Sequence, residues 1–105
     1  MNFYPLDDTC NLREGYLKCF TIEGKELLLV QSNGLIRLID HRCPHDGYSL
    51  KKARLSNGCI ECPKHRICFQ LADGGPLGGE AVSDVPRLVP YDLVEEGEKI
   101  GILMG

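Results

Sequence analysis

The sequence predicts an all-β fold built from short antiparallel strands. Apolar and β-branched segments of strand length alternate with turn residues, and no segment keeps a helical period for long. Asn33-Gly34 follows one such segment, and this dipeptide accepts the positive φ angles that a hairpin turn requires. In a chain of 105 residues, these observations predict one small domain spanning 1–105.

The first half of the chain predicts an antiparallel meander. Its expected strands cover 17–22, 26–31 and 35–39, and a separate short strand is expected over 3–6. The strand 26–31 is expected to be central, because Leu27 to Val30 are apolar on both faces of the strand. Between 49 and 55 we expect either a turn of helix or a loop.

The second half predicts shorter strands and more irregular chain. The expected strands cover 59–61, 67–71 and 99–104. Pro90 favours an edge position for the segment 87–94, because proline cannot donate a hydrogen bond to a neighbouring strand. The Gly/Pro-rich stretch 72–79 is expected to be a loop, and 95–98 a turn.

Composition and charge narrow the class of protein. The chain is 43% apolar and 26% charged, which is typical of a globular domain, and its net charge of −3 argues against a nucleic-acid binder. No apolar run approaches the length of a membrane span, and the first residues lack the pattern of a signal peptide. We therefore expect a cytoplasmic protein, whose six cysteines are thiols or metal ligands.

Two short motifs predict a metal centre. Cys43-x-His45 and Cys62-x-x-His65 each place a thiol beside an imidazole, with sixteen residues between the pairs. Two Cys and two His fit either a structural zinc ion or a [2Fe–2S] cluster with mixed ligands. Zinc fingers usually pair Cys with Cys and His with His. Here each segment contributes one of each, which favours an iron–sulfur cluster clamped between two similar loops.

These motifs resemble those of Rieske-type ferredoxins. The resemblance covers nearly the whole chain and is carried by Cys43-Pro44-His45, Asp46 to Leu50, Cys62-Pro63-Lys64-His65, Phe69 and the Gly-rich stretch 73–76. It implies a Rieske-like antiparallel β-sandwich or barrel, with a small cluster-binding subdomain over about 41–72. It also implies that Cys43 and Cys62 hold the inner iron of one [2Fe–2S] cluster, and His45 and His65 the outer iron.

The resemblance is closer to one branch of the family. Rieske proteins of respiratory and photosynthetic complexes carry a disulfide between the two loops, and Tyr48 and Lys64 occupy the matching positions here. The ferredoxins that serve aromatic-ring dioxygenases lack that disulfide. This implies a potential of roughly −150 mV rather than roughly +300 mV. Arg66 departs from the family, which commonly has Gly directly after the second His.

The function implied is electron transfer rather than catalysis. No nucleophile–base pair is evident, so we expect no reaction of the chain's own. The resemblance implies a one-electron carrier between a flavin-dependent ferredoxin reductase and a terminal oxygenase. Two alternatives stay open: the Rieske-like small subunit of assimilatory nitrite reductase, and a structural zinc-binding domain used for protein interaction.

The remaining Cys and His residues are expected to be structural. His41 is interpreted as a polar residue entering the first loop. Cys59 forms Cys-x-x-Cys with Cys62, but we favour a buried thiol in a strand over a redox dithiol or an alternative ligand. Cys19 and Cys68 are expected to be small core residues, and Cys10 carries no information.

Basic residues gather around the motif. They are either a solvated rim or a docking surface for acidic redox partners. They comprise Arg42, Lys51, Lys52, Arg54, Lys64 and Arg66.

Overall fold

A computed structural model describes residues 2–42, 49–62, 68–77, 88 and 90–104. Three antiparallel sheets and a single 3-10 turn, η1 (Thr9–Asn11), form the regular structure of these residues. No α-helix occurs among them, so the prediction of an all-β fold is confirmed. Within the same ranges, no helix is long and apolar enough to cross a membrane.

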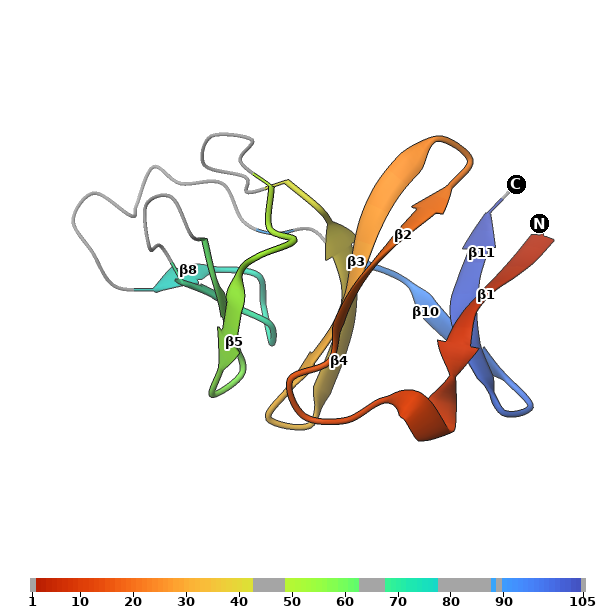
Figure 1. The fold of residues 1–105 in the computed structure, drawn as a ribbon, viewed down its shortest axis with the longest axis horizontal. Coiled ribbons are helices and arrows are strands. Elements are labelled where there is room, and N and C mark those ends of the chain that lie inside the picture. Colours follow the sequence, from red (N-terminus) through yellow and green to blue (C-terminus); the bar gives the residue numbers. More distant parts are fainter. Residues whose placement is uncertain (1, 43–48, 63–67, 78–87, 89, 105) are drawn as a thin grey trace.

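The central sheet contains the predicted meander (Figure 1). Its strands lie in the order β2 (Leu17–Ile22), β3 (Lys25–Ser32), β4 (Leu35–Asp40) and β9 (Pro90–Tyr91). The turn residues Glu23, Gly24, Asn33 and Gly34 all have positive φ. Asn-Gly and glycine tolerate this conformation, which is why both hairpins are tight. Pro90 lies in the edge strand, as predicted.

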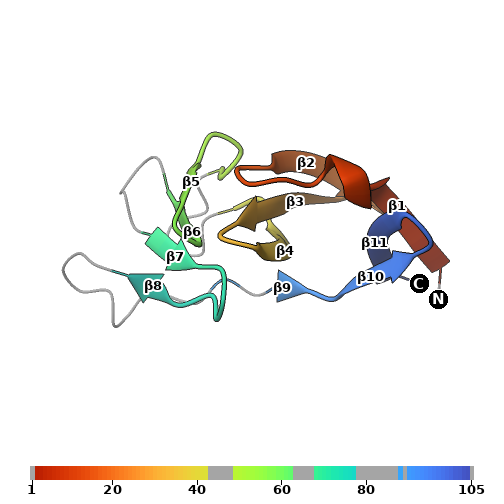
Figure 2. The ribbon, with the colours of Figure 1, turned by 90° about the horizontal axis from the view of Figure 1, so that it is seen from below.

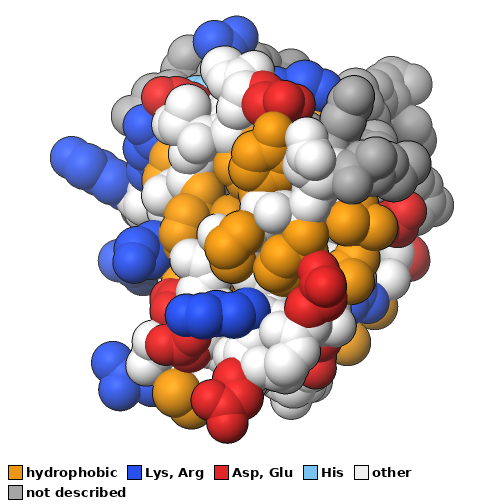
Figure 3. Space-filling model, turned by 90° about the vertical axis from the view of Figure 1, so that its right-hand side faces the viewer, with side chains coloured by type: hydrophobic (Ala, Val, Ile, Leu, Met, Phe, Trp, Pro, Cys, Tyr) orange, Lys and Arg blue, Asp and Glu red, His pale blue; other side chains and the backbone are white. Residues whose placement is uncertain are grey.

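A second sheet joins the two ends of the chain. β1 (Asn2–Asp8) pairs with β11 (Lys99–Met104), which also pairs with β10 (Leu93–Glu96), and Figure 1 shows the termini side by side. Figure 3 shows apolar side chains gathered on this end of the molecule, with charged side chains around them. A Cβ on Gly101 would clash with the Tyr4 carbonyl oxygen and would lie 2.9 Å from the Phe3 ring, so glycine permits the close approach of β1.

The third sheet is small and lies at the other end of the molecule. Its strands lie in the order β5 (Arg54–Ser56), β6 (Cys59–Glu61), β7 (Cys68–Gln70) and β8 (Pro76–Leu77). Figure 2 shows it beside the central sheet, with the sheet of the termini on the far side. The molecule is therefore elongated, with extents of 43 × 26 × 21 Å.

Two hydrophobic cores meet at β3. Leu27 and Leu29 point into the core between the central sheet and the sheet of the termini. Leu28 and Val30 point into the core shared with the third sheet. All four side chains are fully buried, which confirms that this strand is central and apolar on both faces.

Polar contacts fasten the third sheet to the central one. The buried Ser32 hydroxyl donates to Glu14 Oε2 at 3.1 Å and accepts from the Gly58 N–H at 3.0 Å. The Arg37 Nε donates to the Leu71 carbonyl at 2.9 Å. Ser32 thus connects three segments that lie far apart in the sequence.

Several local predictions were wrong. β8 forms within the stretch expected to be a loop, because Pro76 pairs with Phe69 across the third sheet. Residues 54–56 form a strand rather than helix or loop, and Glu95 and Glu96 extend β10 instead of forming a turn. β1 extends two residues past its predicted end, because it pairs with β11.

The chain after β1 is held by the Asp7 carboxylate. Its oxygens accept hydrogen bonds from Asn11 Nδ2 (2.8 Å), the Tyr16 hydroxyl (2.5 Å) and the Asp8 N–H (2.8 Å). These three bonds, that from Asn11 first, lower the pKa of Asp7 to about 2. Burial, followed by the bond to Asp7, raises the pKa of Tyr16.

We expect Ser32→Ala to destabilise the protein by about 1–3 kcal/mol, because it leaves the Gly58 N–H and the Glu14 carboxylate without their shared partner. Urea denaturation measures the loss. Ser56→Ala is the matched control, since Ser56 is exposed and its hydroxyl makes no hydrogen bond within the described chain. Equal midpoints for the two variants would contradict the role given to Ser32.

We expect Asp7→Asn to remove part of the acid sensitivity of folding. The folded pKa of Asp7, about 2, lies below the unfolded value of about 3.9, so its contribution is full above about pH 4 and lost as the pH falls towards 2. Urea midpoints measured between these pH values should fall less steeply for the variant. Asp92→Asn is the control, because Asp92 is exposed and makes no hydrogen bond in the described part of the chain. A pH dependence unchanged by Asp7→Asn would exclude this role.

Candidate metal centre

Backbone pairing closes the base of each predicted ligand loop. The first loop leaves β4 and returns at Ser49, which forms an isolated antiparallel bridge with Arg42. Beside this bridge, the Leu50 N–H donates to the His41 carbonyl at 2.6 Å. The second loop leaves β6 and returns at β7, where Glu61 pairs with Cys68. Each predicted ligand pair is thus carried by a segment whose two ends are fixed.

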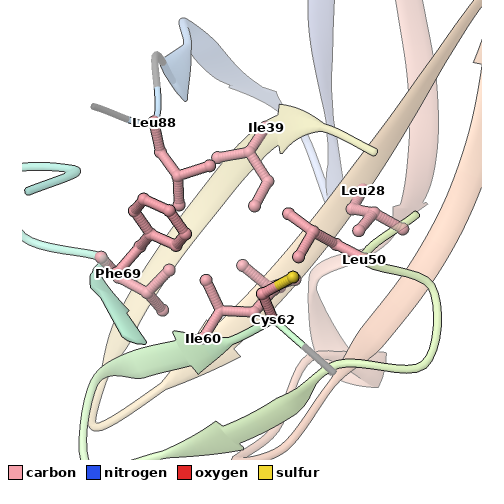
Figure 4. Close-up of a cluster of buried hydrophobic side chains, with 9 residues drawn as sticks. Leu28, Ile39, Leu50, Ile60, Cys62, Phe69 and Leu88 are labelled. Carbon is pink, nitrogen blue, oxygen red and sulfur yellow. The ribbon is translucent and has the colours of Figure 1, made fainter. Parts of the chain in front are cut away.

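The two loop bases share one hydrophobic core. Leu50, at the return of the first loop, and Cys62, at the start of the second, are both fully buried in the same cluster. Figure 4 shows these two side chains next to each other, with Ile60 and Phe69 from the third sheet nearby. Packing therefore sets the two loop bases beside each other, as a centre held by both loops requires.

Cys62 is the one predicted ligand that lies within the described residues. It is a free thiol with no exposed surface and no hydrogen bond within that part of the chain. Burying a thiolate costs free energy unless a cation neutralises its charge. Iron in an iron–sulfur cluster binds thiolate and supplies that positive charge. The environment of Cys62 therefore fits the inner, water-excluded side of a [2Fe–2S] cluster.

The other predicted ligands, Cys43, His45 and His65, lie outside the described residues, as do Tyr48, Lys64 and Arg66. Among the residues that the structure describes, no group of three His, Cys, Asp or Glu side chains could hold a metal ion.

His41 anchors the base of the first loop. Its Nε2 lies 3.0 Å from Glu26 Oε2, and its N–H donates to the Glu26 carbonyl at 3.3 Å. Lys51 Nζ, after the loop, lies 3.7 Å from the same carboxylate oxygen. Glu26 on β3 therefore binds both sides of the loop base. This contact was not predicted, because it depends on the register that places Leu27 opposite Asp40.

Cys59 and Cys62 do not form a dithiol. Cys59 is half-buried and lies on the face of β6 opposite Ile60, whereas Ile60 and Cys62 share the buried core. The interpretation of Cys59 as a thiol in a strand is confirmed, although it is not fully buried. Because successive side chains point to opposite faces of a strand, the sulfurs of Cys59 and Cys62 lie on different faces.

The prediction that Cys68 is a core residue was wrong, whereas Cys19 packs against the core as expected. Cys68 is half-buried on the same face of the third sheet as Glu61, and its thiol lies 3.8 Å from Glu61 Oε2. Burial and the nearby carboxylate raise the pKa of Cys68, which keeps it protonated. Cys10 is exposed in η1.

Gly74 lets the chain return to this core. Its φ is +76°, and its carbonyl accepts the Leu88 N–H at 2.8 Å. A Cβ at this position would lie 2.1 Å from the Leu88 carbonyl oxygen, so only glycine fits. Leu88 is buried in the same core as Cys62.

Residues 2–89 match the family model described as the Rieske [2Fe–2S] domain. The chain belongs to this family. The predicted cofactor, a Rieske-type [2Fe–2S] cluster, is thereby confirmed as the group that the domain carries, whereas its assignment to four particular side chains stays a prediction. The two closed loop bases of this Rieske domain and the buried Cys62 fit that group.

Curated relatives fall into two kinds. Over 92 residues the chain is 36% identical to mouse apoptosis-inducing factor 3, covering 88% of this chain and 15% of that protein. Over 89 residues it is 30% identical to the ferredoxin component of the naphthalene 1,2-dioxygenase system of Pseudomonas aeruginosa, covering 85% of this chain and 83% of that one. The Rieske domain thus spans a small part of the first relative and most of the second.

Solved structures agree with the fold. The Sphingomonas yanoikuyae B1 ferredoxin superimposes with a TM-score of 0.82 at 19% identity, covering 99% of this chain and 100% of that one. The ferredoxin of carbazole 1,9a-dioxygenase from Nocardioides aromaticivorans IC177 gives 0.80 at 23% identity, covering 97% of each chain. The prediction of a Rieske-like antiparallel β fold is confirmed.

We expect Gly74→Ala to cost more stability than Gly34→Ala. Both glycines have positive φ, which costs an alanine about 1–2 kcal/mol, but a Cβ on Gly34 meets no atom within 4 Å. The clash with Leu88 adds about 1–3 kcal/mol at position 74. Urea midpoints of the two variants give the difference directly. Equal losses would mean that the chain at 88 moves freely away.

Proposed function

We propose that this Rieske domain is a one-electron carrier whose cluster is held by Cys43, His45, Cys62 and His65. The observation that carries the proposal is the position of Cys62, which is buried in the core that also anchors the first ligand loop. When bound, the cluster supplies a site for one electron. The part of the chain over about 41–72 would form its binding subdomain, and the whole of 1–105 a single domain.

The described residues would serve that function in two ways. Leu50, Ile60 and Phe69 form an apolar floor beside Cys62, which keeps water from the inner side of the centre. The paired loop bases and the Glu26 contacts fix the ends of the two loops. A site that is fixed in both redox states needs little reorganisation when an electron arrives or leaves.

The proposed partners are a flavin-dependent ferredoxin reductase and a terminal oxygenase, with no reaction catalysed by the chain itself. Support comes from the Pseudomonas relative, which is named as the ferredoxin component of a dioxygenase system. It also comes from a structure of similar fold, described as a complex of reduced oxygenase and oxidised ferredoxin in carbazole 1,9a-dioxygenase (TM-score 0.81, 17% identity, covering 95% of this chain and 91% of that chain). Free thiols at five described cysteines support a cytoplasmic, reducing location.

A second candidate is a redox domain working within a larger polypeptide. The greater identity to apoptosis-inducing factor 3, in which the matching region is a small part of the length, favours it. Both candidates require the same cluster. The nitrite reductase alternative differs from the proposed function in its redox partner. The zinc alternative differs from it in metal content.

We expect alanine at any one of Cys43, His45, Cys62 or His65 to abolish assembly of the cluster, because each leaves an iron without a ligand. After anaerobic reconstitution with iron and sulfide, iron and acid-labile sulfide analysis with the visible spectrum measures assembly. The reduced native protein should give an EPR spectrum with the low average g value of histidine ligation.

Cys59→Ala is the matched control, since it removes a thiol three residues from Cys62 on the opposite face of β6, and it should assemble the cluster normally. One zinc and no labile sulfide in the native protein would establish the zinc alternative instead. Full assembly in Cys62→Ala would refute the proposed ligand set.

A further inference from the structure

The charges of this chain are unevenly distributed along its sequence. Over 40–77, six Lys and Arg stand against four Asp and Glu, a net charge of +2. The rest of the chain has six Lys and Arg against eleven Asp and Glu, a net charge of −5. The segment 40–77 includes the whole third sheet and both loop bases, and the sign of its charge is opposite to that of the whole protein.

Four exposed basic residues lie around the loop bases, and we call them the basic rim. They are Arg42, Lys51, Lys52 and Arg54. Arg42 pairs with Ser49 at the first loop base, and Lys51 and Lys52 follow the buried Leu50. Arg54 pairs in the sheet with Glu61, directly before Cys62. The rim therefore lies beside both loop bases.

Within the described residues, only one member of the basic rim pairs with a carboxylate. Lys51 pairs with Glu26, but Lys52 and Arg54 form no ion pair with any described residue. The Arg42 guanidinium contacts His41 and no described carboxylate. A cluster held by two thiolates and two neutral imidazoles is neutral when oxidised and carries one negative charge when reduced, so binding it leaves the rim positive.

The opposite end is acidic. Asp7 and Asp8 end β1, and Glu95, Glu96 and Glu98 lie on the hairpin of β10 and β11. Figure 1 shows these elements at the far end from β5 and β8, along the longest axis of the molecule. The basic rim and these acidic residues therefore lie at opposite ends of the described structure.

We infer that this end docks on an acidic protein surface, and that the basic rim orients the encounter. The inference rests on the proposed function, since it names the chemistry of the redox partner. An acidic partner attracts the rim and repels the opposite end, so the field turns the electron-exchanging end towards the partner before contact.

Small redox complexes of opposite charge test the sign of the field at that end. The dithionite-reduced protein is mixed with tris(oxalato)cobaltate(III), a trianion, or with tris(phenanthroline)cobalt(III), a trication. One electron leaves the protein and converts cobalt(III) to cobalt(II), and no protein bond forms or breaks. Stopped-flow absorbance gives the rate constant from about 0.01 to about 0.15 M ionic strength, over which the Debye length falls from about 30 to about 8 Å.

With the trianion, we expect the rate constant to fall with added salt by a factor on the order of ten, because screening removes the attraction of the rim. The trication should show the opposite trend. The net charge of −3 alone would give the reverse signs. A rate constant that rises with salt for the trianion would overturn the inference.

Two matched double variants locate the effect. Lys52→Gln with Arg54→Gln should abolish or reverse the salt trend with the trianion. Arg13→Gln with Lys18→Gln changes the net charge equally but alters exposed residues outside the basic rim, and it should keep the native trend. Equal effects of the two pairs would refute the assignment to the rim.

A binding measurement separates this inference from the proposed function. Calorimetric titration with hexacyanocobaltate(III), a trianion that is not reduced, should show binding that the Lys52/Arg54 double variant loses and the Arg13/Lys18 double variant keeps. A protein that assembles no [2Fe–2S] cluster would refute the electron carrier, and the titration would still report on the rim. An intact cluster without trianion binding would refute the rim alone.

Discussion

The burial of β3 on both faces is the constraint on which the rest of the structure depends. Burying a leucine side chain contributes about 1.5–3 kcal/mol, and Leu27, Leu28, Leu29 and Val30 are buried in succession. Because successive side chains point to opposite faces, the strand divides this gain between two cores. The core beneath the sheet of the termini and the core beneath the loop bases therefore both depend on the backbone of β3. A shift of β3 by one residue would exchange the side chains of both cores at once.

The candidate centre depends on this strand through packing and through Glu26. Leu28 and Val30 form one wall of the core in which Leu50 and Cys62 are buried. Glu26, at the start of the same strand, reaches both ends of the first loop base. Exposed ion pairs contribute little stability, so we regard Glu26 as fixing geometry and the apolar contacts as supplying the energy. Ser32, at the end of the strand, adds the bond to the third sheet.

Features fixed by neighbouring residues could be predicted from the sequence, and features fixed by distant contacts could not. The hairpin at Asn33-Gly34 and the strand 59–61 follow from local turn chemistry and β-branched residues. β8 was missed because two residues in a Gly/Pro stretch become a strand only when Phe69 lies beside them. The pairing of β1 with β11 joins opposite ends of the sequence, which no local pattern encodes. At the site, the Cys and His spacing led to the family. The contacts of Glu26 and Gly74 depended on register and on the path of the returning chain.

The separation of the two cores also bears on how a small domain can combine stability with electron exchange. The sheet of the termini closes its core far from the loop bases, so stability there does not constrain the surface that meets a partner. The other core contains the two loop bases, where the chain before and after each loop is paired. Charge follows the same division, with acidic residues on the closed end and the basic rim beside the loop bases. If the rim docks as proposed, its substitutions change the choice of partner with little effect on folding, because exposed charges rarely contribute more than about 1 kcal/mol. The buried side chains of β3 have no such freedom, because each supports one of the two cores.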